Sequence, residues 1–353
     1  MNTLFIGLAA ILILSILFLL FRIQSLVTIV KGSHQKVGMS NKVNGALMLI
    51  VPIILLALTV WYSPIAAESF LPEASSEHGL VTDRLFWTSI TVVSIMFLIT
   101  NAGLFWFAYK YQYKEGRQAS FFHDNTRLEV FWTIVPAVIM ALLVFFGWKA
   151  WSDIMVEPPK EAIKVEIMGK QFAWQVRYPG KDKEFGNHDF RLIDDVAGNE
   201  FGIDFEDKNS EDDFIARELY IPKGKPVLFK IRARDVLHSV FAPHFRVKMD
   251  AVPGMPTQFH FVPTKTTEEM RTELNNPEFN YELACTEICG RGHFAMKFII
   301  VVVEPNEYNK WVAEQTPFLE SNPQFKGKGL SDLRKKNLAK KKAEEKSEEQ
   351  ASL

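Results

Sequence analysis

Four long stretches in the N-terminal half of the chain contain no charged residue: 4–21, 45–62, 85–108 and 130–148. At about 1.5 Å of rise per residue, each would reach ~27 Å or more as a helix, close to the roughly 30 Å of a hydrocarbon core. A buried helix of a water-soluble protein rarely continues so far without a polar face. The pattern therefore predicts four transmembrane helices, two within residues 1–62 and a helical hairpin over 85–151.

The charges of the connecting segments predict the orientation of these helices. The charged residues of segments 22–44 and 110–127 are mainly lysine and arginine, whereas those of segment 63–84 are mainly acidic. Because basic loops stay in the cytoplasm, both termini are expected on the outer face. A cleaved signal peptide is the alternative for the first stretch, but residues 1–3 carry no positive side chain and no small-residue cleavage site follows Phe21.

The pattern changes near residue 152 to short β-branched and aromatic runs separated by proline and glycine. The expected strands cover 163–167, 172–178, 217–221, 227–233, 259–262 and 298–303. Many short strands with such turns are typical of a sandwich or barrel. We therefore expect a membrane-anchored all-β protein, in which transmembrane α-helices precede a β-domain over residues 152–306.

Two charged segments interrupt or follow this domain. Residues 181–218 contain thirteen acids against five bases, which is typical of a solvated surface insertion, or of a patch that attracts a basic partner protein. Residues 307–353 form a charged extension whose end is rich in lysine and then glutamate. Because that end has few apolar residues to bury, we expect the extension to be disordered or a fraying helix.

Composition excludes several classes of protein. The chain has 353 residues, of which 48% are hydrophobic, and a net charge of −1 that argues against electrostatic binding of nucleic acid. Its two cysteines exclude a disulfide-dense scaffold, and the absence of C-x-x-C-H excludes haem attached through that motif. No histidine lies inside an apolar stretch, so this chain is not expected to bind haem within the membrane.

The candidate chemistry lies in the sequence CTEICGRGHFAMKF, residues 285–298. It holds both cysteines, Cys285 and Cys289, followed by His293 and Met296, between strand-like YELA and KFIIVVV. Thiolate and thioether ligands favour copper. With two thiolates in one loop, each sulfur can bridge two copper ions with one histidine per ion, an arrangement suited to electron transfer.

Other interpretations of this loop remain open from the residues alone. A structural disulfide, a tetrahedral Cys₂His₂ zinc site and a chance motif with Met296 in the core are the three alternatives. The second histidine must come from upstream, where His238, His244 and His260 are the candidates. His260 has the sequence context of an ordinary strand residue. The residues around His238 and His244 favour neither of these two over the other as the ligand.

Three segments resemble subunit II of haem–copper cytochrome c oxidases: NTRLEVFWTIVPAVI (125–139), DVLHSVFAPHFRVKMDAVPGM (235–255) and the cysteine loop. The resemblance covers roughly residues 85–305 and implies a transmembrane hairpin followed by a cupredoxin β-sandwich with a dinuclear copper centre, CuA. It implies bridging by the two cysteines and ligation by His238, His293, Met296 and the backbone carbonyl of Glu287. It further implies a magnesium ion, shared with the catalytic subunit, on the Glu287 carboxylate.

The resemblance also implies roles outside the copper centre. Glu129 matches a glutamate at the entrance of a proton path, although an acid in the first turn of a helix also suits the helix dipole. Phe172 occupies a position that often holds the tryptophan receiving electrons, and Trp174 matches a second aromatic residue. Both are candidates for electron input. Residues 1–62 are two additional helices with no assigned role.

The expected function is electron input to a respiratory cytochrome c oxidase. The chain would accept electrons from cytochrome c, soluble or tethered, and pass them to haem in the catalytic subunit I, where oxygen is reduced to water and protons are pumped. Further oxidase subunits and the lipid membrane are the other expected partners, in a bacterial-type inner membrane with the copper domain on the periplasmic face.

Other functions fit these residues less well. A membrane-anchored copper chaperone is the main alternative, but chaperones place a C-x-x-x-C pair before the histidine and lack the G-x-G-H-x-x-M continuation. A quinol oxidase subunit would lack the copper ligands. Nitrous oxide reductase needs a catalytic propeller that a chain of 353 residues cannot house.

Overall fold

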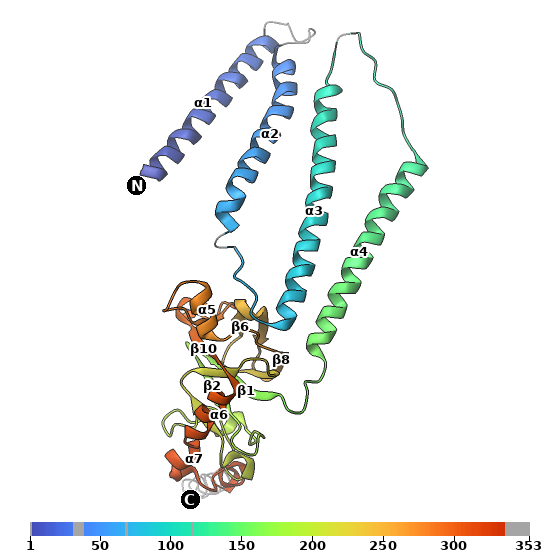
Figure 1. Ribbon diagram of the computed structural model, residues 1–353. Helices are drawn as coiled ribbons and strands as arrows, with labels where there is room; N and C mark the ends of the chain where they lie inside the picture. Colours follow the sequence, from blue (N-terminus) through green and yellow to red (C-terminus); the bar gives the residue numbers. More distant parts are fainter. Residues whose placement is uncertain (1, 31–38, 68–69, 115, 336–353) are drawn as a thin grey trace, which may run out of the picture. The chain divides into compact units, whose positions relative to one another are not determined.

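The computed structural model describes residues 2–30, 39–67, 70–114 and 116–335 (Figure 1). Within it the chain divides into two compact units, one of Met1–Leu71 with Trp87–Ala141 and the other of Pro72–Phe86 with Leu142–Leu353. The first is helical and the second holds all the strands. Each unit is described separately.

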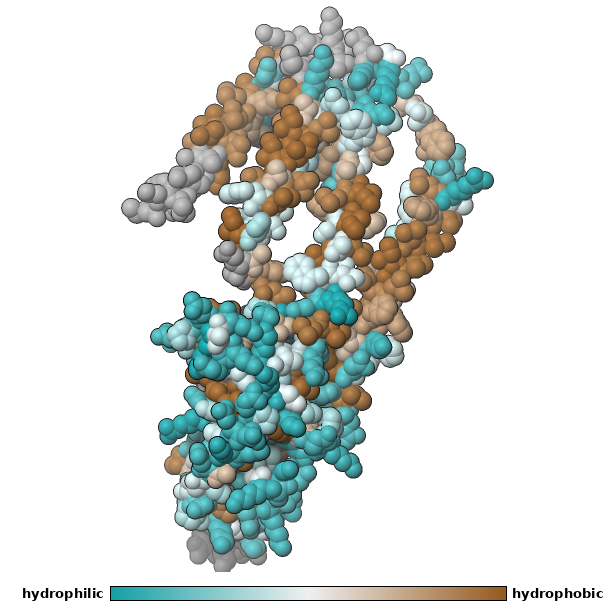
Figure 2. Space-filling view, in the orientation of Figure 1, coloured by the Kyte–Doolittle hydropathy of each residue, from teal (hydrophilic) through white to brown (hydrophobic). Residues whose placement is uncertain are grey.

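The long helices are α1 (Asn2–Val30), α2 (Met39–Ala67), α3 (Glu77–Lys110) and α4 (Thr126–Met155). Among the described residues, three apolar segments are long enough to cross a membrane: Asn41–Ala67, Glu77–Lys110 and Thr126–Met155. At most 6% of each segment's most apolar window is buried, so these helices present apolar side chains outward, as the brown surface in Figure 2 shows. The described apolar part of α1, Ile11–Val27, is shorter, and the fourth crossing stays a prediction.

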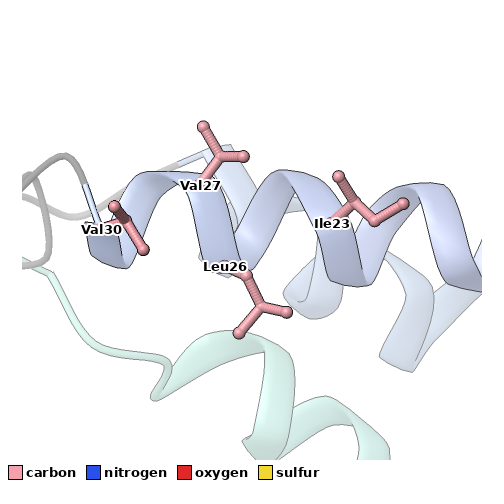
Figure 3. Close-up of a pocket in the computed structure, with 4 residues that line it drawn as sticks. All are labelled: Ile23, Leu26, Val27 and Val30. Atoms are coloured by element: carbon pink, nitrogen blue, oxygen red, sulfur yellow. The ribbon is translucent and has the colours of Figure 1, made fainter.

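Helix α1 carries a shallow apolar depression near its C-terminal end. Figure 3 shows the four aliphatic side chains that line it, namely Ile23, Leu26, Val27 and Val30. These side chains offer no polar or metal-binding atom, and their exposed surface suits contact with lipid or with an apolar protein surface.

The outer domain consists of two five-stranded sheets. The first has the order β3-β2-β1-β5-β8 and the second the order β4-β10-β9-β6-β7. The strands of the first sheet are β1 (Ile163–Lys170), β2 (Ala173–Tyr178), β3 (Phe214–Ala216), β5 (Val227–Ala233) and β8 (Thr257–Phe261). Those of the second are β4 (Leu219–Pro222), β6 (His238–Ala242), β7 (Val247–Ala251), β9 (Tyr281–Cys285) and β10 (Lys297–Val303).

The core between the sheets follows from alternation along the strands. On β1, Val165 and Ile167 are fully buried and join residues of the second sheet, such as Leu283 and Ile300, in one cluster. Short helices connect the strands, of which α5 (Thr267–Glu273) begins with a capping box. The β-sandwich and the six predicted strands are confirmed, while β3, β6 and β7 were not predicted.

The acidic segment 181–218 is not simply a solvated insertion. Alternate apolar residues of this segment, Phe201, Ile203 and Phe205, are buried against Met168 on the outward face of β1. Its short 3₁₀ helices are η2 (Phe190–Leu192) and η3 (Lys208–Ser210). The many acids hid this apolar alternation in the sequence. Strand β1 is consequently covered on both faces.

The first part of the extension 307–353 is ordered by packing, rather than disordered or a fraying helix as expected. Helices α6 (Pro305–Glu314), α7 (Phe318–Ser321) and η6 (Pro323–Phe325) follow the last strand. Trp311 stacks on Tyr220 with ring centroids 4.6 Å apart, and Phe325 stacks on Phe205 at 5.4 Å. A few well-spaced aromatic residues therefore order a segment that looks polar on average. Residues 336–353 lie outside the described residues.

Candidate metal centre

The pairing of two strands brings His238 close to Cys285. His238 begins β6 and Cys285 ends β9, and these strands pair antiparallel with Val240 opposite Cys285. Because side chains two residues apart on a strand share a face, His238 and Cys285 lie on the same side of the sheet. The His238 Nδ1 atom is 3.9 Å from the Cys285 sulfur.

The loop after Cys285 folds back to supply the other donors. The Cys289 sulfur lies 3.9 Å from the Cys285 sulfur, 3.6 Å from Nδ1 of His293 and 3.9 Å from the Met296 sulfur. His293 belongs to the 3₁₀ helix η5 (His293–Ala295). The backbone carbonyl oxygen of Glu287 lies 3.2 Å from the Cys285 sulfur.

These distances divide the donors into two halves. His238 and the Glu287 carbonyl lie beside Cys285, whereas His293 and Met296 lie beside Cys289. Each sulfur therefore has its own histidine and its own weaker donor. We call this set of six residues the thiol cluster.

The thiol cluster is largely buried and contains no lysine or arginine. His238, Cys289 and Met296 are less than 5% exposed, and both cysteines are free thiols rather than a disulfide. Burial and the neighbouring Cys285 thiol raise the pKa of Cys289 to about 11. A bound cation would reverse this preference, because metals bind the thiolate form. Two cysteine thiolates, a methionine thioether and two imidazoles are the donors that copper prefers.

The structure separates the three upstream histidines. His238, Cys285 and Cys289 place their donor atoms within 4.8 Å of one another. His244 instead packs its ring on Phe279 and Tyr281, with centroids 5.2 and 5.3 Å away. His260 lies on β8 in the other sheet, opposite Leu228. The geometry thus assigns His238 and excludes His244 and His260 from the cluster.

The two aromatic candidates lie beside the thiol cluster in different ways. Trp174 is 3% exposed and meets the His238 ring edge to face, with centroids 5.9 Å apart. Phe172 is 41% exposed and lies against the cysteine loop, where a Cβ added to Gly292 would come within 2.5 Å of its ring. Phe172 is therefore the aromatic surface over the loop, and Trp174 is the buried contact.

Glu129 lies in the other unit, and its position does not assign it a role. It occupies the first turn of α4, where the Asn125 side chain accepts a hydrogen bond from the Leu128 backbone N–H at 3.1 Å. The Glu129 side chain is exposed. This position suits a helix N-terminus as well as the entrance of a proton path.

Sequence reasoning missed two polar residues that contact the thiol cluster. Asp235 lies 2.8 Å from His238, and Gln171 donates a hydrogen bond to the Cys289 carbonyl at 2.6 Å. Asp235 could have been noticed from its place three residues before His238. Gln171 is 118 residues from Cys289 and gave no signal.

The sequence matches two family profiles. Residues 163–303 match the periplasmic domain of cytochrome c oxidase subunit II, and residues 64–149 match its transmembrane domain. Helix α1 and nearly all of α2 precede the matched region.

Individual relatives agree with these profiles. The alternative cytochrome c oxidase subunit 2 of Bradyrhizobium diazoefficiens is 32% identical over 263 residues, covering 73% of this chain and 85% of its own. Cytochrome c oxidase subunit 2 of Thermostichus vulcanus is 28% identical over 269 residues, covering 69% and 78%. The crystal structure of the periplasmic domain of subunit II of cytochrome oxidase of Bradyrhizobium japonicum is 25% identical and covers 44% of this chain and 94% of its own, with a TM-score of 0.30.

Proposed function

The chain belongs to the cytochrome c oxidase subunit II family, the electron-input subunit of haem–copper oxidases, and on this premise we propose that its thiol cluster holds a dinuclear copper centre. It is a membrane protein with an outer-facing β-domain. The observation that carries the proposal is a pair of buried sulfurs 3.9 Å apart, each with its own histidine.

Each half of the thiol cluster would hold one copper ion. Cys285 and Cys289 would bridge both ions, His238 and the Glu287 carbonyl would complete one half, and His293 and Met296 the other. The grouping of donors by distance supports this division. When bound, such a copper pair takes up and releases one electron at a time. The alternatives of zinc and of a single exchangeable copper leave part of this donor set unused.

The surrounding chain would keep the ligands dry and nearly immobile. His238 and Cys285 are held at the ends of paired strands, and Met296 directly precedes β10. Ligands fixed by sheet hydrogen bonds change little in position when the charge of a bound metal changes. A small structural change on reduction favours fast electron transfer.

Electron input would occur over the cysteine loop. The donor would be cytochrome c, soluble or tethered, and the exposed ring of Phe172 would be the surface contact, with Trp174 behind it against His238.

The haem-bearing catalytic subunit would accept the electrons. Glu287 contributes its backbone carbonyl to the thiol cluster. Its side-chain carboxylate would bind a magnesium ion that is shared with the catalytic subunit. Further oxidase subunits would contact the exposed membrane helices.

Glu129 would admit protons to the complex from the cytoplasmic side of a bacterial-type inner membrane. The basic residues of segment 110–127 support this orientation, with a multi-pass chain and a periplasmic copper domain. Glu129→Gln should slow proton-coupled turnover in the assembled oxidase and leave the copper content unchanged. Loss of copper in this variant would contradict the assigned role.

The substitution Cys289→Ser tests the copper assignment directly. It should remove the spectrum of an electron shared between two copper ions and abolish oxidation of cytochrome c, while the chain still assembles in the membrane. Thr286→Ser is a matched control in the same loop and should behave like the unmodified protein. Unchanged cytochrome c oxidation by Cys289→Ser, or one exchangeable copper per unmodified chain as in a chaperone, would overturn the proposal.

A further inference from the structure

We propose that Asp235 and Gln171 are positioning residues, which tie the two ligand-bearing segments together and make the two halves of the copper centre unequal. The inference rests on the proposed copper function and extends it to residues that do not themselves bind metal. It follows from a continuous set of hydrogen bonds running from His238 to Cys289.

The Asp235 carboxylate is shared by three groups. Its Oδ1 lies 2.8 Å from Nε2 of His238 and accepts a hydrogen bond from the Val236 backbone N–H at 2.7 Å. Its Oδ2 accepts a hydrogen bond from the backbone N–H of Gln171 at 2.7 Å. One carboxylate thus joins the segment before β6 to the two-residue turn between β1 and β2, where Gln171 lies.

Gln171 continues the connection to the cysteine loop. Its side-chain Nε2 donates to the carbonyl of Cys289 at 2.6 Å. The adjacent Phe172 ring packs on the same loop, since a Cβ added to Gly290 would lie 2.9 Å from it. Gly290 also has a φ of +134°, a conformation that side chains disfavour. The β1–β2 turn therefore fixes the backbone on which Cys289 lies.

Asp235 also determines which nitrogen of His238 faces the metal. With a carboxylate 2.8 Å from Nε2, that nitrogen carries the proton, and Nδ1 presents its lone pair toward Cys285. The His238 ring has little freedom to turn, because it packs tightly against Gly169 and Trp174. A Cβ atom added to Gly169 would lie 2.9 Å from the side chains of both His238 and Trp174. A histidine held in this way by a carboxylate becomes a stronger donor to a metal.

The other half of the centre has no such support within the described residues. His293 contacts Cys289 through Nδ1 but has no ion pair with a carboxylate there, and it is half-buried where His238 is fully buried. The copper ion beside His238 should therefore receive more electron density than the ion beside His293. Removing the Asp235 charge should act mainly on the His238 half.

Asp235→Asn in the full-length protein tests this inference. Loss of a carboxylate that supports a metal-bound histidine typically costs 10–100-fold in metal affinity, so we expect a copper affinity lower by about that factor. The reduction potential should rise, because a weaker donor stabilises the oxidised state less. The paramagnetic proton resonances of the His238 ring should shift more than those of His293. Asp235→Glu should restore part of each effect.

A matched control is Asp250→Asn, which removes a different carboxylate, one that accepts from Ser239 on the same strand as His238. It should leave affinity and potential unchanged. Gln171→Leu keeps the Asp235–His238 pair and removes the contact with Cys289, so it should speed copper loss with little change in potential. If Asp235→Asn fails to fold, Gln171→Leu still tests the proposal. An unchanged rate of copper loss in Gln171→Leu would contradict the proposed connection between Gln171 and the cysteine loop.

The outcomes separate this inference from the proposed function. Fewer than two copper ions in the unmodified protein would defeat both. Two copper ions in the unmodified protein, with Asp235→Asn equal to Asp250→Asn in affinity and potential, would overturn the positioning role alone. Equal shifts of both histidine rings would also overturn it, because they would show a general loosening rather than an effect on one half.

Discussion

The outer domain buries two polar clusters that are neutralised in opposite ways. In the thiol cluster, burial and the neighbouring Cys285 thiol raise the pKa of Cys289 and so favour its neutral form. The second, which we call the arginine cluster, consists of Arg177, Glu166, Asp213 and Arg232, of which the first three are at most 3% exposed. Its charges compensate one another inside the protein, whereas the thiol cluster is the site for which we propose bound copper.

The contacts of the arginine cluster show how complete this compensation is. Arg177 contacts Glu166 at 2.5 Å and Asp213 at 3.0 Å, and Arg232 contacts the other Glu166 oxygen at 2.5 Å. Burial opposes ionisation of Glu166, but Arg177 and Arg232 outweigh it and lower its pKa to about 2. The cluster joins β1 and β2 to the acidic segment, where the Gly186 carbonyl also accepts from Arg177. It therefore stabilises the fold of the outer domain, whereas the thiol cluster is the proposed copper site.

The largest effect on stability is expected from Arg177→Met. Removing one partner of a buried ion pair leaves an uncompensated charge and typically costs 3–5 kcal/mol. We expect a loss of about that size in the free energy of unfolding of the outer domain, measured by urea denaturation in detergent, with the copper content of the folded protein unchanged. Lys164→Met, which breaks an ion pair with the exposed Glu184 2.6 Å away, should cost about 0–1 kcal/mol. Equal costs for the two variants would contradict the contrast between buried and exposed pairs.

Removal of copper should destabilise the domain through the other cluster. A ligand that binds only the folded state stabilises it by about 4 kcal/mol at a free concentration 1,000 times its Kd. Chelation should therefore lower the melting temperature of the outer domain in both the unmodified protein and Arg177→Met. Because the clusters share no residue, the two losses should add. A melting temperature that does not change with copper would show that the thiol cluster binds no metal.

The most gradual effect concerns pH. Burial raises the pKa of Asp213 to about 7 against the pull of Arg177. Because the unfolded carboxyl titrates near pH 4, the stability that Asp213 contributes is complete below about pH 4 and is lost as pH rises to about 7, by roughly 1 kcal/mol per unit. Burial lowers the pKa of His188 to about 4, which gives the opposite slope over the same range. The difference in stability between Asp213→Asn and the unmodified protein isolates Asp213, and a difference that is constant from pH 4 to 7 would contradict its raised pKa.

The two clusters also differ in how far the sequence predicts them. Five of the six donors lie within twelve residues, so spacing alone revealed most of the thiol cluster. Spacing left His238 and His244 equal, the family resemblance favoured His238, and the register that places Val240 opposite Cys285 supplies the structural reason. Nothing in the sequence pointed to the arginine cluster, because Glu166 and Asp213 are far apart and look like ordinary surface acids. Long-range contacts of this kind depend on packing, and local patterns do not carry them.

The same limit explains the errors in the fold. Long apolar helices can be predicted from the length of their uncharged stretches. Strands with several β-branched residues can be predicted from the alternation of polar and apolar positions. Strand β6 contains only five residues and begins with His238 and Ser239, which are polar yet fully buried because Asp235 and Asp250 satisfy them. Segment 307–335 is ordered by single aromatic side chains such as Trp311, whose partners lie on distant strands.

The most direct test of the account is a metal count, combined with an electron paramagnetic resonance spectrum, on the purified full-length protein. Two copper ions per chain, with hyperfine splitting from both nuclei in the oxidised state and loss of the signal on reduction, are the predicted result. Zinc in the cluster, or splitting from one copper nucleus alone, would contradict a thiolate-bridged pair at Cys285 and Cys289.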